Sequence, residues 1–117
     1  MTGKRAVEAR ALHDELCRRL AEIGVEHRAW PGRDDGFAAL LHDGKELGHF
    51  HHWAEIDLRL GQAIIEREKL SPLRESTVHP ERAAHSPWHE MKLLSSSDVD
   101  EAVRLVHFAI ASKKKNK

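Results

Sequence analysis

The side chains of this sequence with the widest chemistry are its histidines. The chain holds 10 histidines among 117 residues, and imidazole both titrates near neutral pH and serves as a common ligand of metal ions. His49 and His51 lie two residues apart in a stretch that predicts a β-strand. Their rings should therefore project from one face of a sheet, with their roots about 7 Å apart. Two imidazoles at this spacing could bind a metal ion or an anion together.

A third ligand would have to come from another part of the chain. Residues 73–87 form a polar stretch with two prolines and two histidines, long enough to fold over a sheet. The candidates near it are His79, His85 and His89. Three imidazoles and a water can hold zinc and generate a hydroxide for hydrolysis. The sequence has no contiguous zinc signature, so we expect no cofactor and keep zinc at His49, His51 and His79 as the alternative.

Two tryptophans could complete such a site. Trp53 follows the histidine pair and could shield a pocket or cap the sheet edge, and Trp88 opens a later strand and could be a stacking wall or part of the core. The predicted ligand-binding residues are His49, His51, Trp53, His79 and Trp88.

The remaining nucleophiles have no catalytic context. Cys17 is the single cysteine, which excludes an internal disulfide and any cysteine-rich zinc motif. It lies beside the apolar stripe of a predicted helix, so we expect a buried, inert thiol. Ser97 is explained as a helix N-cap. Whether the protein is an enzyme stays open.

The elements that would position these residues follow from periodicity. Apolar residues every three to four positions predict helices at residues 5–23, 61–70 and from 97 onward, and alternation predicts strands at 25–30, 55–60 and 88–94. Asp43-Gly44 favours a two-residue turn between strands 37–42 and 45–52. A regular hairpin would then pair His42 with Lys45, Leu40 with Leu47, Ala38 with His49, and Phe37 with Phe50.

These elements predict an α+β fold in the order α-β-β-β-β-α-β-α. An antiparallel sheet of about five strands would carry helices mainly on one face and histidines on the second. We expect a single domain over residues 1–112 and a disordered, lysine-rich tail at 113–117. The second face could also form a homodimer interface.

Charge and hydropathy limit the partners. The 19 basic and 19 acidic residues balance, and without the four lysines after residue 112 the acidic residues prevail, which argues against a nucleic-acid groove. No apolar run approaches the roughly 20 residues of a membrane helix. We therefore expect a cytoplasmic protein without membrane contact, whose partner is a small anionic molecule or a peptide.

Several motifs resemble the small bacterial luciferase-domain family over residues 36–112. They are ELGHFH at 46–51, EIDLRL at 55–60, the His79-Pro80 loop, Trp88, and SSSDVDEAVRLVHFAI at 95–110. Ser86-Pro87 stands where that family tends to have glycine. The members are largely uncharacterised, and the name implies no light-emitting reaction. The order of elements is also similar to YjbR-like α+β domains, some of which are discussed as DNA binders.

The sequence thus predicts a non-catalytic binding or interaction module with a histidine-lined pocket. A metal-dependent hydrolase and a YjbR-like DNA-binding domain remain the alternatives.

Overall fold

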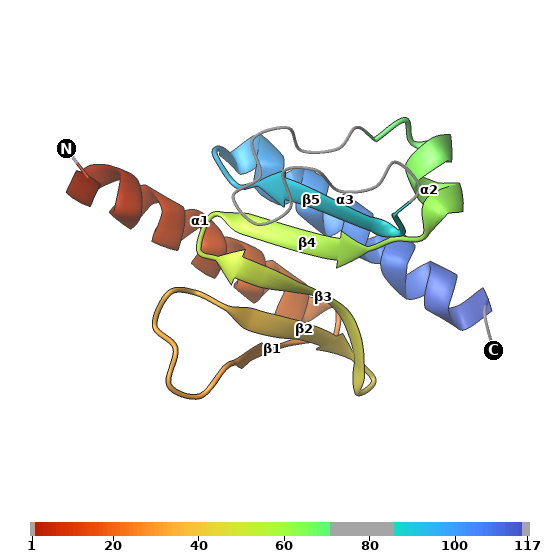
Figure 1. Cartoon of the computed structure of the whole chain (residues 1–117), viewed down its shortest axis with the longest axis horizontal. Coiled ribbons are helices and arrows are strands. Elements are labelled where there is room, and N and C mark those ends of the chain that lie inside the picture. Colours follow the sequence, from red (N-terminus) through yellow and green to blue (C-terminus); the bar gives the residue numbers. More distant parts are fainter. Residues whose placement is uncertain (1, 71–85, 116–117) are drawn as a thin grey trace.

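The computed structural model describes residues 2–70 and 86–115 of the chain. The elements are α1 (Thr2–Glu22), β1 (Val25–Ala29), β2 (Ala38–His42), β3 (Lys45–His52), β4 (Glu55–Arg59), α2 (Gln62–Arg67), β5 (Trp88–Lys92) and α3 (Ser96–Lys115). The predicted α+β class and element order are confirmed (Figure 1). Helix α3 continues to Lys115, past residue 112 where the sequence placed the end of the domain.

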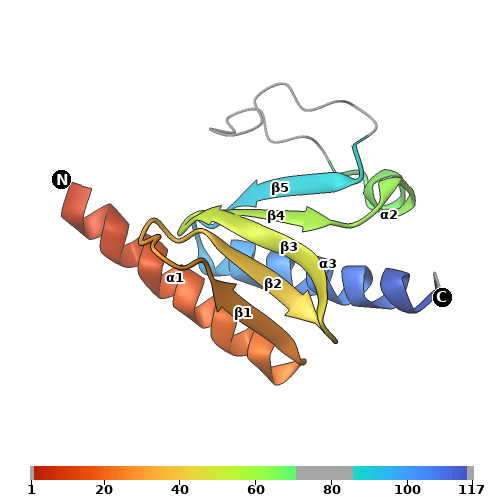
Figure 2. The ribbon, with the colours of Figure 1, turned by 60° about the horizontal axis from the view of Figure 1, so that its bottom comes forward.

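The five strands form one antiparallel sheet in the order β1-β2-β3-β4-β5. Helices α1 and α3 pack against each other and cover one face, which we call the inner face (Figure 2). The opposite side of the sheet is the outer face. Helix α2 lies beyond the ends of β4 and β5 (Figure 1). None of the described helices is both long and apolar enough to cross a membrane.

The core fills the space between the inner face and the two long helices. Its apolar members come from both layers, as the alternation and the helical stripes predict. The fully buried side chains include Leu16, Leu20, Leu40, Leu47, Phe50, Ile56, Leu58, Leu93, Val99, Leu105 and Val106. A core built on one face leaves the other face free to carry polar groups.

The β2–β3 hairpin has the predicted turn but not the predicted register. Asp43 and Gly44 have φ of 52° and 78°, as a type I′ turn requires, and His42 pairs with Lys45. A bulge between Leu40 and Leu41 then shifts the register by one residue, so that Leu40 pairs with Gly48, Ala39 with His49 and Ala38 with Phe50. The predicted pairs Leu40–Leu47, Ala38–His49 and Phe37–Phe50 are wrong, because the inserted residue changes the parity of β3.

The bulge explains how Leu47 and Phe50, which have opposite parity, are both buried in the core. Gly48 lies beside it at a close approach of two backbones. A Cβ on Gly48 would stand 2.3 Å from the Asp57 carbonyl oxygen and 3.0 Å from the Leu58 Cα. Only glycine lets β3 lie against β4 at this point.

The start of α3 is capped by Ser95 rather than by the predicted Ser97. The Asp98 amide donates to the Ser95 hydroxyl at 3.4 Å, and the Asp98 carboxylate accepts a hydrogen bond from the Leu94 amide at 2.8 Å. This arrangement is a variant of the capping box, because the carboxylate accepts from the residue before the serine and not from the serine amide itself. The cap fixes where α3 starts directly after β5.

Candidate functional site

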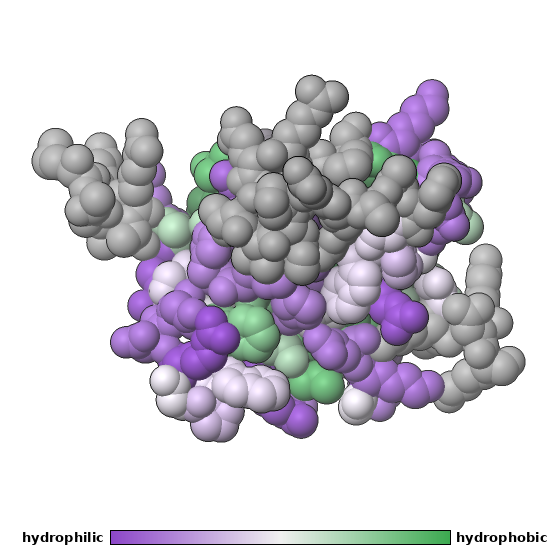
Figure 3. Space-filling model, viewed as in Figure 1, coloured by the Kyte–Doolittle hydropathy of each residue, from purple (hydrophilic) through white to green (hydrophobic). Residues whose placement is uncertain are grey.

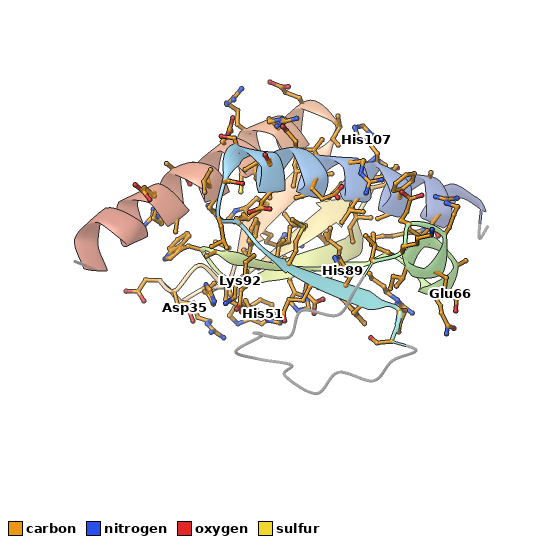
Figure 4. All side chains as sticks on the ribbon, turned by 90° about the horizontal axis from the view of Figure 1, so that it is seen from above. Asp35, His51, Glu66, His89, Lys92 and His107 are labelled. Carbon is orange, nitrogen blue, oxygen red and sulfur yellow. The ribbon has the colours of Figure 1, made fainter. Side chains whose placement is uncertain are left out.

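Two imidazoles and two carboxylates meet on the outer face. His49 and His51 share this face as the sequence predicts, with ring centroids 4.6 Å apart. In the sheet, His49 pairs with Asp57, and Asp57 pairs with Glu90 on the next strand. The row across β3, β4 and β5 therefore brings both carboxylates to the histidines. We call His49, His51, Asp57 and Glu90 the outer-face cluster; Figure 4 shows His51 on the side of the sheet away from α1 and α3.

The donor atoms of this cluster lie at metal-ligand spacing. His51 Nε2 is 3.3 Å from Asp57 Oδ2 and 3.3 Å from Glu90 Oε2. His49 Nε2 is 4.0 Å from Asp57 Oδ2. Ligands about 2.1 Å from a tetrahedral zinc ion lie about 3.4 Å from each other. His49, His51 and Asp57 are therefore close enough to share one ion, and Glu90 adjoins them through its contact with His51.

The carboxylates of the cluster are buried. Asp57 is 1% and Glu90 4% exposed, although acidic residues are almost never buried without a partner. Neither Glu90 oxygen accepts a hydrogen bond from the described part of the chain, and its contact with His51 is the 3.3 Å approach given above. A buried carboxylate without a cation or hydrogen-bond donors is costly. Among the described residues, two buried carboxylates therefore face two imidazoles at this site.

The surroundings of the two histidines suit metal ligation. Burial lowers the pKa of His51, and the neighbouring His49 lowers it further, against the opposing effect of Asp57 and Glu90. Nδ1 of His49 donates a hydrogen bond to the Glu46 carboxylate at 3.1 Å, which leaves the Nε2 lone pair directed toward the cluster. A carboxylate behind a ligating histidine is a common arrangement at metal sites, since it fixes the tautomer and the ring orientation.

Aromatic rings flank the cluster. The ring centroid of Trp88 is 5.2 Å and that of Phe37 5.9 Å from His49. Trp88 is half-buried, and its ring borders the site next to His49. The part of the outer face that Figure 3 leaves uncovered by grey atoms is mainly hydrophilic with small hydrophobic patches.

Two of the other candidates, Trp53 and His89, lie away from the outer-face cluster. Trp53 packs against α1, with the Arg10 guanidinium 3.9 Å from its ring centroid and the His13 ring 4.9 Å away. His89 pairs with the core residue Leu58 and so lies on the inner-face parity of β5, opposite to Glu90. His79 and His85 lie outside the described residues. Among the described residues, the groups that adjoin His49 and His51 are Asp57 and Glu90.

The sequence analysis missed both carboxylates. The sequence contains only weak indications of these two residues. Asp57 is the acidic residue between two apolar ones in EIDLRL, and Glu90 has the same parity as Trp88. An acidic residue in a strand normally faces solvent, and only the pairing of β3 with β4 and β5 shows that these two face His49. This pairing is a long-range property that spacing does not encode.

The chemistry of the donor set favours a cation over the anion expected from the sequence. Imidazole nitrogens with carboxylate oxygens suit Zn²⁺ and related transition metal ions, whereas Mg²⁺ and Ca²⁺ prefer oxygen ligands throughout. His49, His51 and Asp57 each offer a ligand atom, and these atoms all lie within 4.8 Å of one another. A free anion would meet two buried negative charges there.

Fold and cluster together define a small α+β protein with a histidine and carboxylate cluster on the sheet face opposite its two long helices. Within this class the chain belongs to the luciferase-domain family, whose model matches residues 44–109, more than half of the chain. The match contains the whole outer-face cluster. No curated protein and no solved structure matches the chain.

Proposed function

We propose that this protein is a small binding module that holds one divalent transition metal ion, with Zn²⁺ as the best fit, at the outer-face cluster. The observation that carries the proposal is the meeting of two buried carboxylates with two imidazoles at 3.3–4.0 Å. Two negative charges are neutralised by one divalent ion, and neutral imidazoles add ligands without adding charge.

A metal ion bound at the outer-face cluster can also bind the small anionic molecule or peptide that the sequence predicts as the partner. Asp57 and Glu90 are buried, whereas His49 is half-buried. One side of the bound ion therefore faces Phe37 and Trp88, the aromatic rings that flank His49. A coordination position on that side accepts an anionic group, such as the carboxylate of a peptide or small molecule. The ion, rather than protein cations, supplies the positive charge.

Metal analysis and calorimetry test the proposal. Full-length protein is stripped with a chelator and titrated with Zn²⁺, alongside His51→Ala and a control, His107→Ala, which removes an exposed histidine on the outer side of α3 (Figure 4). We expect one ion per chain in the wild type and the control, and at least about 10-fold weaker binding in His51→Ala. Circular dichroism checks that the variant is folded. Equal affinity in all three proteins, or no binding in the wild type, would overturn the proposal.

Metal-dependent hydrolysis is the second candidate, and Glu90 is the observation that favours it. Its carboxylate lies beside His51 without a hydrogen bond from the described residues, so it could act as a base toward water held at the site. Glu90→Gln should then abolish hydrolysis of activated esters or phosphoesters more than it weakens Zn²⁺ binding. If wild-type protein loaded with Zn²⁺ hydrolyses none of them, the binding module stands alone.

DNA binding is the third hypothesis, and the buried acidic pair weighs against it. Asp57 and Glu90 would repel phosphates from the outer face. Any affinity for DNA should therefore reside in the lysines after residue 112 and disappear on truncation there.

A further inference from the structure

A second group of metal-ligating side chains lies on the inner side of the sheet, outside the cluster described above. His13 and Cys17 stand one helical turn apart on α1, and His27 faces them from β1. Each offers a ligand atom, and the three atoms lie within 4.8 Å of one another. We call this group the inner cluster. It lies entirely outside the segment that matches the family model.

The inner cluster is enclosed by aromatic rings. The His13 side chain is 3% exposed, and its ring centroid lies 4.5 Å from Phe50, 4.9 Å from Trp53 and 5.2 Å from His27. Surroundings of this kind have a low dielectric, so they tolerate a complex without net charge better than a charged one.

The donor atoms lie close together. Nδ1 of His13 donates a hydrogen bond to Asp14 at 3.0 Å, and the Cys17 sulfur is 3.7 Å from the His13 Nε2 and 4.0 Å from its Nδ1, so the His13 ring must rotate to direct Nε2 at an ion bound to the sulfur. Nε2 of His27 is buried and has no hydrogen-bond partner in the described part of the chain. A buried imidazole nitrogen without a partner is unfavourable, and a metal ion would satisfy it.

Titration keeps both rings neutral. Burial lowers the pKa of His13 and of His27 below the usual value for histidine. Burial also raises the pKa of the Cys17 thiol to about 12. The metal-free thiol of the half-buried Cys17 is thus protonated, and a metal ion that binds it must displace its proton.

We propose that His13, Cys17 and His27 form a three-coordinate site for a soft monovalent metal ion, Cu(I). One thiolate and one monovalent cation give a neutral complex with two imidazoles, which fits the enclosed, aromatic surroundings. Zn²⁺ would leave a net positive charge and require a fourth ligand. Sulfur with imidazole is the donor set that soft Cu(I) accepts.

The binding reaction is balanced by one proton. The S–H bond of Cys17 breaks, the sulfur–copper bond forms, and one proton leaves for each ion bound, with no change of oxidation state. Ligands about 2.1 Å from a trigonal ion lie about 3.7 Å apart. The 3.7 Å between Cys17 Sγ and His13 Nε2 already meets this spacing, and the other two pairs of ligand atoms lie within 4.8 Å.

Anaerobic titration of the full chain with Cu(I), against a chromophoric Cu(I) chelator as competitor, tests the inner site. We expect one tightly bound ion, one proton released per ion, and X-ray absorption showing one sulfur and two nitrogen ligands. Cys17→Ser, a nearly isosteric change, should weaken Cu(I) binding at least about 100-fold, whereas His51→Ala should leave it unchanged. Ag(I) serves as an air-stable substitute in the same assay.

The result is independent of the outer-face proposal, because the two sites share no residue. Unchanged Cu(I) affinity in Cys17→Ser, loss of affinity in His51→Ala, or binding of Zn²⁺ but not Cu(I) at the inner cluster would overturn this inference. His27→Ala provides a second variant, since it removes a half-buried ring on the edge strand β1 and leaves the core of α1 intact. It should weaken Cu(I) binding as well.

Discussion

Replacing Glu90 by glutamine should stabilise the metal-free protein and weaken its metal binding. The substitution keeps the shape of the side chain and removes one of the two buried negative charges. Asp57 Oδ2 and Glu90 Oε2 each lie 3.3 Å from His51 Nε2, so they are separated by at most twice that distance. At an effective dielectric constant of 20, two like charges at this largest possible separation repel by about 2.5 kcal/mol.

His51 does not cancel this repulsion near neutral pH, because its lowered pKa leaves the ring uncharged. Part of the repulsion is relieved by relaxation, so we expect Glu90→Gln to raise the free energy of unfolding of the chelator-treated protein by about 1–2 kcal/mol. For a domain of this size the midpoint of thermal unfolding should rise by about 4–8 °C. Zn²⁺ affinity should fall at least about 10-fold, since one charge and one ligand are lost.

Urea denaturation with and without Zn²⁺ measures both effects. Glu22→Gln is the matched control, because Glu22 is exposed and forms only a surface pair with Arg18; it should change neither quantity. The reasoning fails if Glu90→Gln destabilises the metal-free protein, because Glu90 would then make favourable contacts in that state. It also fails if Zn²⁺ affinity is unaffected.

The other predictions concern packing, pH and the thiol. Gly48→Ala should destabilise the protein by about 1–3 kcal/mol in urea denaturation and weaken Zn²⁺ binding. The reason is that its Cβ would meet the Asp57 carbonyl oxygen at 2.3 Å and push β3 from β4. A variant with the stability and affinity of the wild type would contradict this close approach. The metal-free protein should lose stability as the pH falls below about 6.5, because His13, His27 and His51 have lowered pKa values and the unfolded chain binds more protons than the native state. Each histidine contributes up to about 1.4 kcal/mol per pH unit between its unfolded and folded pKa values, and a flat profile between pH 7.5 and 5.5 would refute this. Cys17 should react with iodoacetamide at pH 7.5 much more slowly in the native protein than in urea, because burial raises the pKa of its thiol to about 12; equal rates would show an accessible thiolate.

The sequence by itself determined the features that depend on neighbouring residues. The period of apolar side chains gave the element order, Asp43-Gly44 gave the turn, and the spacing of two gave His49 and His51 a common face. These are local properties, since the geometry of one helix, one turn or one strand decides them. Family membership was likewise carried by short motifs in order along the chain.

The tertiary structure alone decided what those histidines meet. A bulge at Leu40 shifted the hairpin register, and strand pairing placed Asp57 and Glu90 beside His51. Trp53 packs against α1 and not in the predicted pocket. Such partners are selected by the packing of the whole core, because a bulge or a shift of one residue reverses every side chain beyond it. Residue spacing gives the direction of a side chain, and only the assembled sheet and helices give its surroundings.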